Sequence, residues 1–497
     1  MSLTSPIPVA TLRGADPRRW WALAVLASLQ FMLILDATVV NVALPSIKAD
    51  LGFSQANLAW VVDAYVLVAG GFLLLGGRLA DLFGRRRTFL AGAVAFAVGS
   101  ALSGVAQDQV MLIGSRALQG LGEALAGPAA LSIITVLFSD QKERTTALSI
   151  WGGLAGLGGT IGVLLSGVII DLADWRWIFW INLPVAAAVL VSSLRLVPSD
   201  RRRANAGFDL PGALTATGGI TAVVYALLEA NRVGWTSART LAFFAAGPAL
   251  LAAFVAIESR QGSPLVPLRF FRARRPRTAS GLMVLVASAL YGMFFLLTLY
   301  MQLVLHWTPL HTGVAYVAFG IGILAGIATA SQLVPRIGVR PVLVGGMTLA
   351  ASGLALFARL PLHLHYWSQM VPGMVLVSVG LGLAFVTLTV SAVSESSDAD
   401  AGLASGMVTT AQQVGGALGL AVLVSVATGR ASSLLGAGHP ASVAQLGGSH
   451  LAFGVGAGLL AIGAVLAAAL IGRFKPAALP TPTAITQEDD EPEPLVA

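Results

Sequence analysis

Four ionisable side chains lie inside stretches that are otherwise apolar. Asp36, Asp63, Arg116 and Glu123 each interrupt a hydrophobic run long enough to cross a bilayer. A charge at the centre of a membrane helix costs about 2.5 to 3.5 kcal/mol on insertion scales, so such residues are rare and mark function. A carboxyl group that alternates between a desolvated site and a neighbouring arginine takes up and releases a proton. The residue types therefore predict proton coupling, with Asp36, Arg116 and Glu123 on the proton path.

Helix geometry places three of these charges at one level. Asp36, Asp63 and Arg116 each lie about six to eight residues from the outer end of their run, which is roughly 9 to 12 Å at 1.5 Å per residue. Glu123 follows Arg116 on nearly the same helix face, about 10.5 Å deeper. A bilayer tolerates such groups only when they are paired or hydrated. We therefore expect them to line a polar chamber that opens outward.

A purely structural role is the alternative for each of these groups. Asp36 could be held by Thr38, Asn41 or a backbone group, and a later start of the second run would put Asp63 among lipid headgroups. Arg116 could serve only as a pairing group. Glu123 could be a buried acid whose hydrogen bonds are all made within the protein.

The composition indicates an integral membrane protein. Of the 497 residues, 56% are hydrophobic and 11% charged, whereas soluble chains carry about 25% charged residues. The 56 glycines agree, because glycine allows membrane helices to approach closely. The chain has no cysteine, which excludes disulfides and cysteine-based metal or redox sites. The net charge of +7 comes from short loops rather than from one polar face, which argues against nucleic-acid binding.

Apolar runs of membrane-spanning length predict an all-α protein with fourteen transmembrane helices. We place these helices at 20–43, 57–76, 88–106, 110–134, 146–170, 177–197, 210–229, 239–258, 278–302, 311–333, 341–358, 367–391, 401–427 and 450–472.

The distribution of lysine and arginine predicts the orientation. Of the 30 basic residues, 23 lie at the termini or in even-numbered loops and 6 in odd-numbered loops. By the positive-inside rule, both termini are expected in the cytoplasm of a multi-pass inner-membrane protein. The first 19 residues lack the apolar core of a cleavable signal sequence, so the first span is expected to direct insertion.

A faint internal repeat suggests the domain organisation. The segment L-A-D-L-F-G-R-R-R-T-F-L-A-G from Leu79 resembles L-V-P-R-I-G-V-R-P-V-L-V-G-G from Leu333, with two glycines and an arginine at one fixed offset. Two parallel repeats related by an axis along the membrane normal would produce this pattern. The expected units are an N-terminal six-helix bundle in 1–200, an inserted helix pair with a basic linker in 201–270, a C-terminal six-helix bundle in 271–475 and a disordered acidic tail in 476–497.

Small and amide residues mark further positions. In the fifth span, Gly158, Gly162 and Gly167 are expected to permit close helix packing. The thirteenth span carries Gln412 and Gln413 among glycines and is a candidate wall of a substrate cavity. The candidate substrate contacts are these two glutamines together with Asp63 and Gln302.

Five motifs, in order, resemble the 14-span drug/proton antiporters of the major facilitator superfamily. They are L-D-A-T-V-V-N-V-A-L-P, G-R-L-A-D-L-F-G-R-R-R, L-I-G-S-R-A-L-Q-G-L-G, W-R-W-I-F-W-I-N-L-P and S-G-M-V-T-T-A-Q-Q-V-G-G-A-L-G. The resemblance implies that Asp36 takes part in proton coupling, that Arg116 is associated with proton transfer and that Asp63 favours lipophilic cations.

The resemblance also implies a gating loop after the second span, formed by Gly77, Asp81, Gly84, Arg85 and Arg86. The acid of this loop is expected to contact the positively polarised start of the thirteenth span, near residue 401. The arginines of the loop could pair with the acidic residues just before that span, which are Glu395, Asp398 and Asp400.

One motif departs from the family pattern. The fifth span reads Gly162-Val163 where the family usually has Gly-Pro, and Ser166 stands where a glycine is usual. The kink that proline imposes is therefore not expected. This departure keeps a proton symporter, or a dedicated exporter of an endogenous metabolite, as the alternative function.

We expect a proton-coupled exporter of hydrophobic or cationic drugs that works by alternating access. The coupling ion is the proton, no other cofactor or metal is expected, and the partners are a small amphiphilic substrate and the lipid bilayer, without nucleic acid. The protein is expected to act as a monomer. An enzyme is disfavoured because the chain has no metal-spaced His/Cys set, nucleotide loop or soluble domain. A passive channel fits poorly with a gating loop and with charges confined to one level.

Overall fold

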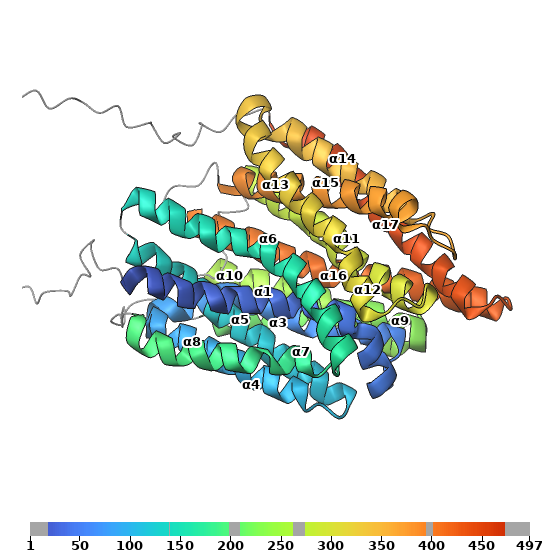
Figure 1. Cartoon of the computed structure of the whole chain (residues 1–497), viewed down its shortest axis with the longest axis horizontal. Coiled ribbons are helices and arrows are strands. Elements are labelled where there is room, and N and C mark those ends of the chain that lie inside the picture. The colour runs from blue at the N-terminus through green and yellow to red at the C-terminus, as the bar shows by residue number, and fades with distance from the viewer. Residues whose placement is uncertain (1–17, 139, 198–208, 262–273, 394–400, 473–497) are drawn as a thin grey trace, which may run out of the picture.

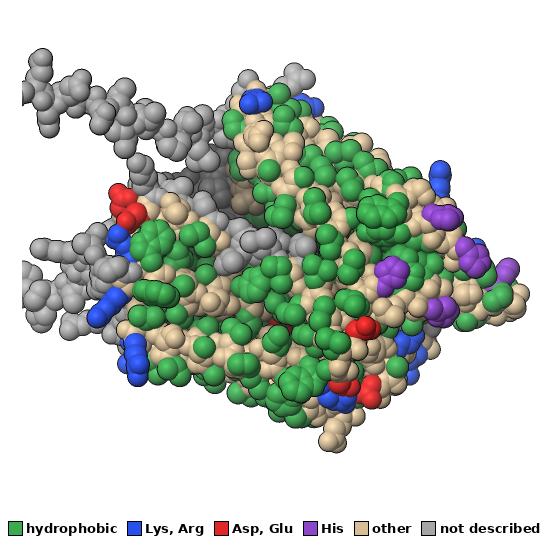
Figure 2. Space-filling model, viewed as in Figure 1, with side chains coloured by type: hydrophobic (Ala, Val, Ile, Leu, Met, Phe, Trp, Pro, Cys, Tyr) green, Lys and Arg blue, Asp and Glu red, His purple; other side chains and the backbone are tan. Residues whose placement is uncertain are grey.

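The computed structural model describes residues 18–138, 140–197, 209–261, 274–393 and 401–472 (Figure 1). Every regular element in these ranges is a helix. A helix satisfies its own backbone hydrogen bonds, which is what a chain needs where lipid replaces water. Figure 2 shows hydrophobic side chains spread over the flank of the molecule, whereas charged side chains gather mainly towards its ends. The flank therefore matches the hydrocarbon layer.

The expected fourteen-helix membrane fold is confirmed in outline. Thirteen helices in the described ranges are long and apolar enough to span a bilayer. A fourteenth, α6 (Gln141–Leu172), occupies the place of the predicted fifth span and contains a shorter apolar stretch at 161–172. Several helices extend beyond the predicted limits, as α1 (Arg18–Leu51) does at its carboxyl end. Hydropathy reports only the part of a helix that lies in lipid, so these extensions gave no signal.

We divide the helices, in chain order, into an N-half, an inserted pair and a C-half. Besides α1 and α6, the N-half contains α2 (Gln55–Leu58), α3 (Trp60–Phe83), α4 (Arg85–Gly104), α5 (Gln109–Leu137), α7 (Trp177–Trp180) and α8 (Asn182–Leu196). The inserted pair is α9 (Leu210–Val233) and α10 (Ala238–Arg260). The C-half contains α11 (Arg274–Leu299), the π-turn η2 (Tyr300–Val304), α12 (Pro309–Ala315), α13 (Val317–Ile337), α14 (Val339–Phe357), the π-turn η3 (Tyr366–Met370), α15 (Val371–Val393), α16 (Ala401–Gly436) and α17 (Ala441–Leu470).

The internal repeat corresponds to a repeated turn and a repeated helix contact. Gly84 joins α3 to α4 with φ of 97°, and Gly338 joins α13 to α14 with φ of 89°. These left-handed conformations favour glycine because it lacks a β-carbon. A β-carbon at Gly92 would lie 2.6 Å from the Ala126 nitrogen of α5, and one at Gly346 would lie 2.8 Å from a backbone oxygen of α15. The two halves therefore pack corresponding helices through corresponding glycines.

The inserted pair lies across one junction between the halves. Helix α9 packs against both α3 and α16, and α10 packs mainly on α9. One apolar cluster joins all four helices through Leu75 of α3, Ala213 of α9, Met407 of α16 and Phe254 of α10. Only 11% of the spanning window of α10 is buried, against 72% for the α11–η2 span, so α10 faces lipid over most of its surface.

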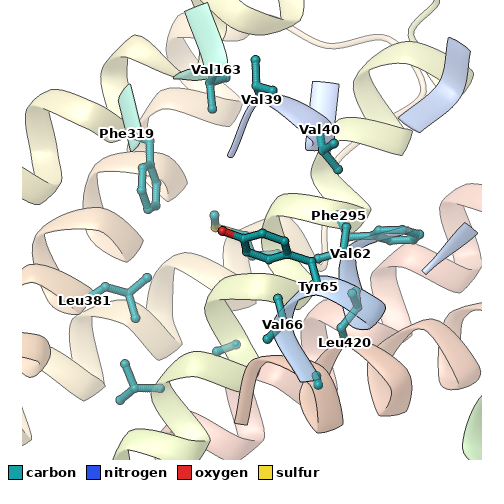
Figure 3. Close-up of a cluster of buried hydrophobic side chains, with 14 of the residues drawn as sticks. Val39, Val40, Val62, Tyr65, Val66, Val163, Phe295, Phe319, Leu381 and Leu420 are labelled. Atoms are coloured by element: carbon teal, nitrogen blue, oxygen red, sulfur yellow. The ribbon is translucent and has the colours of Figure 1, made fainter. Parts of the chain in front are cut away.

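The two halves pack closely at the end of the molecule where α1 finishes, which we call the Leu51 end. A β-carbon at Gly167 of α6 would lie 2.7 Å from the Pro309 oxygen, and Gln302 Nε2 of η2 donates to Val42 O of α1 at 2.9 Å. Figure 3 shows side chains of both halves in one buried cluster, namely Val39, Val40, Val62, Tyr65, Val66 and Val163 of the N-half with Phe295, Phe319, Leu381 and Leu420 of the C-half.

Candidate functional site

Asp36 lies at the centre of a buried hydrogen-bond network within the N-half. Its side chain is fully buried, and its Oδ2 forms an ion pair with Nη1 of Arg116 on α5. Its Oδ1 accepts from Gln119 Nε2 at 3.0 Å and from Asn182 Nδ2 at 2.8 Å. Charge-assisted hydrogen bonds of this kind are the strong ones in proteins. Three donors from α5 and α8 therefore converge on this one carboxylate.

Arg116 joins α1 to α3 and is 1% exposed. Its Nε donates to Val61 O at 3.0 Å, and its Nη1 also donates to Gln119 Oε1 at 2.9 Å. The guanidinium carbon lies 4.4 Å from the centre of the Tyr65 ring, where a desolvated cation–π contact adds stabilisation. The predicted proximity of Asp36 and Arg116 is therefore present, and α3 completes the surroundings of the cation.

Asp63 contrasts with this network. It is fully buried on α3, and neither of its carboxyl oxygens has a hydrogen-bond partner among the described residues. Glu123 of α5 interacts electrostatically with Tyr65, and its Oε2 is buried without a hydrogen-bond partner among the described residues. Tyr291 of α11 lies within electrostatic reach of both acids. Leaving a lone carboxylate in such a place is costly, so this region suits a proton or a cationic group.

The side chains expected to line an outward-opening chamber are enclosed in this conformation. Asp36, Asp63 and Arg116 are all enclosed, with exposures of 0%, 0% and 1%. At the Leu51 end, α6 packs tightly against α12. The depth of a residue in its apolar run predicts the level at which its charge lies, but it does not indicate which side of the protein is closed.

The glutamines expected to contact substrate occupy two separate places. Gln413 of α16 is 7% exposed and accepts from the Tyr291 hydroxyl at 2.9 Å, while the adjacent Gln412 is partly buried. Gln302 lies in the π-turn at the Leu51 end and bonds to the backbone of α1. The structure therefore groups Gln413 with the acids through Tyr291 and places Gln302 at the junction of the halves.

The glycines of α6 face two different neighbours. A β-carbon at Gly158 would lie 2.9 Å from an Ile34 side-chain carbon, and one at Gly162 would lie 3.1 Å from the Leu35 oxygen, both on α1. Gly167 instead faces α12 of the C-half. This helix thus packs on its own half and on the opposite half. Ser166, next to Gly167, donates to Val39 O at 2.6 Å and adds a polar tie to α1.

The predicted gating loop is only partly described. Gly84 forms the turn, and Gly77 packs near Pro128. Arg86 Nη2 donates to Leu194 O at 2.5 Å, close to the carboxyl end of α8, where a cation is favourable. The Asp81 side chain lies outside the described residues. Residues 394–400, which contain the acidic residues expected to pair with Arg85 and its neighbours, also lie outside the described residues.

Sequence reasoning missed the amides that hold Asp36. Gln119 follows Arg116 by three residues and so lies on the same helix face, and this spacing could have indicated that the two side chains interact. Asn182 lies in the W-R-W-I-F-W-I-N-L-P motif, 146 positions from Asp36, and nothing local indicates its partner. Within the described ranges, no group of three or more His, Asp or Glu side chains is arranged to hold a metal ion.

Comparison with known proteins gives a consistent picture. A family model described as Major Facilitator Superfamily matches residues 26–420. The chain is 40% identical to the puromycin resistance protein pur8 of Streptomyces alboniger, over 94% of each chain, and 39% identical to the lincomycin resistance protein of Streptomyces lincolnensis, over 84% of this chain and 87% of that protein. Among solved structures, the POT family transporter PepTSo superposes with a TM-score of 0.66 at 16% identity, covering 92% of this chain and 98% of that chain.

Proposed function

Because this chain belongs to the Major Facilitator Superfamily, we propose that it exports a hydrophobic or cationic antibiotic-type compound in exchange for protons. Family membership makes it a multi-pass membrane transporter of small molecules rather than an enzyme. The names of two relatives, resistance to puromycin and to lincomycin, support an antibiotic cargo. The coupling ion is the proton, and no further cofactor takes part.

The buried Asp36–Arg116 ion pair carries this proposal. Arg116, Gln119 and Asn182 all donate to the Asp36 carboxylate. A proton arriving on Asp36 removes the negative charge that these donors need, so it weakens the hold of α5 and α8 on α1. Arg116 contacts α1 and α3 at once, so the change reaches two helices. Protonation thereby biases the packing of the N-half and with it the balance between the two access states.

Asp63 supplies the second part of the cycle. Its carboxyl group is enclosed without a partner on α3, which suits the charge of a cationic cargo or a proton but not both together. Competition of cargo and proton for one acid produces exchange. We place Glu123 on the path between Asp63 and the Arg116 network, because it interacts electrostatically with Tyr65, whose ring packs on Arg116. Gln413, which accepts a hydrogen bond from Tyr291, contributes a side chain of the C-half to the surface that contacts the cargo.

We assign the Leu51 end to the outside of the cell membrane, with both termini in the cytoplasm, on the bias of lysine and arginine. The N-half and C-half then form the two six-helix bundles, α9 and α10 form the inserted pair, and the monomer is the working unit. The close packing at the Leu51 end represents the state closed to the outside. For a neutral cargo, each proton entering across 100 mV yields about 2.3 kcal/mol, which suffices for tens-fold accumulation, whereas a monovalent cation exchanged for one proton draws only on the pH difference.

A panel assay in a host without its own pumps tests this function. Cells producing the protein are loaded with puromycin, lincomycin or tetraphenylphosphonium, and efflux is followed after energisation. We expect export of at least one compound, and its loss in Asp36→Asn. Asp171→Asn is the matched control, because Asp171 is exposed near the carboxyl end of α6. Uptake instead of export under an inward proton gradient would contradict antiport.

A further inference from the structure

Asn182 is buried at the start of α8 and makes contacts that connect three helices. Its Nδ2 donates to Asp36 Oδ1 of α1 at 2.8 Å and to Ser100 Oγ of α4 at 2.9 Å. Ser100 donates in turn to Phe179 O of α7 at 2.8 Å. We propose that Asn182 is a positioning residue that sets the proton affinity of Asp36, and that Ser100 fixes Asn182 in place. This inference rests on the proposed function, in which Asp36 exchanges protons.

The orientation of the Asn182 amide follows from its neighbours. An amide nitrogen carries two hydrogens and no lone pair for accepting. Asp36 offers carboxylate lone pairs, and Ser100 has already used its own hydrogen on Phe179 O. Both neighbours therefore need a donor, and the nitrogen supplies one hydrogen to each. Asn182 consequently stabilises the ionised form of Asp36 and offers nothing from that nitrogen to the protonated form.

The W-R-W-I-F-W-I-N-L-P segment is fixed to α1 at two points. At the Leu51 end, Trp175 Nε1 donates to Asp50 Oδ2 at 3.1 Å and Arg176 Nη1 pairs with the same oxygen at 2.8 Å. Asn182 provides the second point, deeper along α1, at Asp36. Because Asp50 also holds the start of the segment and Ser100 holds the amide itself, Asn182 cannot follow the Asp36 side chain freely when that side chain moves. With the donor fixed, the free energy of protonating Asp36 depends on where the Asp36 side chain lies relative to Asn182.

Among the described residues, four titratable groups lie near Asp36, and the others that follow are on the remaining helices packed against α1. Arg116 and Glu123 of α5 and Tyr65 of α3 interact electrostatically with it, and Asp63 lies on the same stretch of α3. On the other helices packed against α1, the described titratable groups are Glu143 and Asp171 near the ends of α6, Arg195 near the end of α8, Arg274, Arg275, Arg277 and Tyr291 on α11 and His311 on α12. Asn182 is a neutral contributor among these charges, so replacing it changes the hydrogen bonding of Asp36 without changing the net charge.

The test compares Asn182→Leu with Asn41→Leu. Leucine nearly preserves volume and removes the amide in both cases, but Asn41 donates only to carbonyls of its own helix, Ala37 O and Thr38 O. Efflux of the compound found in the panel is measured against pH in proteoliposomes. For Asn182→Leu we expect the half-maximal pH to rise by about one unit, because one hydrogen bond to a charged group is lost. Ser100→Ala should shift it in the same direction by less, and Asn41→Leu should not shift it.

A second measurement separates positioning from general damage. Infrared difference titration, with Asp36→Asn as the reference, reports the carboxyl band of Asp36 directly and should show the same displacement in Asn182→Leu. Coincident titrations of Asn182→Leu and Asn41→Leu in folded protein would overturn the inference. If Asn182→Leu does not fold, an unshifted Ser100→Ala profile overturns it instead. Undiminished coupled efflux in Asp36→Asn would instead reject the proposed function itself, which keeps the two failures distinct.

Discussion

The two halves of the molecule have corresponding glycine turns but differ in their charges. The N-half encloses Asp36, Asp63 and Arg116, with Glu123 partly buried beside them. The C-half has no Asp or Glu at all in 274–393 or 401–472, and its buried polar groups there are hydroxyls and one amide, Gln413. The repeated glycine turns indicate a common architecture, so the difference is one of side chains. One half carries the buried charges that the proposed proton exchange requires, and the other offers uncharged polar side chains.

This asymmetry has a physical reason. An ion pair between helices is costly to separate in a dry interior, so a pair across the two halves would resist every opening step. The Asp36–Arg116 pair lies entirely within the N-half, as do its supporting amides. Ties across the junction are weaker, such as the bond from Gln302 to Val42 O. The halves can therefore separate without breaking the charge network.

The largest effect is expected from Arg116→Gln. This change leaves Asp36 enclosed without its cation, and removing one partner of a buried pair typically costs about 3 to 5 kcal/mol. We expect loss of transport and a clearly lower melting temperature, measured by tryptophan fluorescence in detergent. The double variant Asp36→Asn with Arg116→Gln should recover much of the stability but not the transport. If the single variant Arg116→Gln is stable and active, the Asp36–Arg116 pair is not needed for transport.

An intermediate effect is expected from Gly167→Leu at the junction of the halves. A β-carbon there already approaches the Pro309 oxygen to 2.7 Å, so a larger side chain forces α6 away from α12. The state closed at the Leu51 end becomes less populated, and transport falls several-fold while its pH dependence stays unchanged. Gly114→Leu is the control, because nothing lies within 4 Å of a β-carbon at that position. Equal rates for the two variants would contradict a working contact here.

The smallest effect is expected from Tyr291→Phe in the C-half. It removes one hydrogen bond to Gln413, worth about 1 kcal/mol, and leaves the ring in place. We expect a change of a few-fold in KM for the exported compound, with no change in the number of protons exchanged per cargo. Radiotracer uptake into inside-out vesicles gives both values. A changed proton count would mean that the C-half takes part in coupling after all.

Much of the architecture could be predicted from sequence because its signals are local. Hydropathy located the helices, and the repeated Gly84 and Gly338 turns followed from one segment compared with another. The meeting of Asp36 with Arg116 followed from depth alone. In contrast, Asn182 is far from Asp36 in sequence, and its contact depends on how α8 packs on α1 and α4.

Two other features had no sequence signal for physical reasons. The enclosure of the charges depends on which access state is populated, and one sequence encodes both states. The position of Gln302 depends on the π-turn that ends the α11 span and turns its side chain towards α1. Such a turn differs from a regular helix by one residue in its hydrogen bonding, which composition does not indicate.

Cargo-dependent proton movement in proteoliposomes tests the central claim most directly. Vesicles with a proton gradient and a trapped pH-sensitive dye receive the exported compound on the side opposite to the protons. The wild-type protein should collapse the gradient in proportion to cargo transported, and Asp36→Asn should leave it intact while remaining folded. Cargo crossing the wild-type membrane with no accompanying proton movement would contradict proton exchange at Asp36.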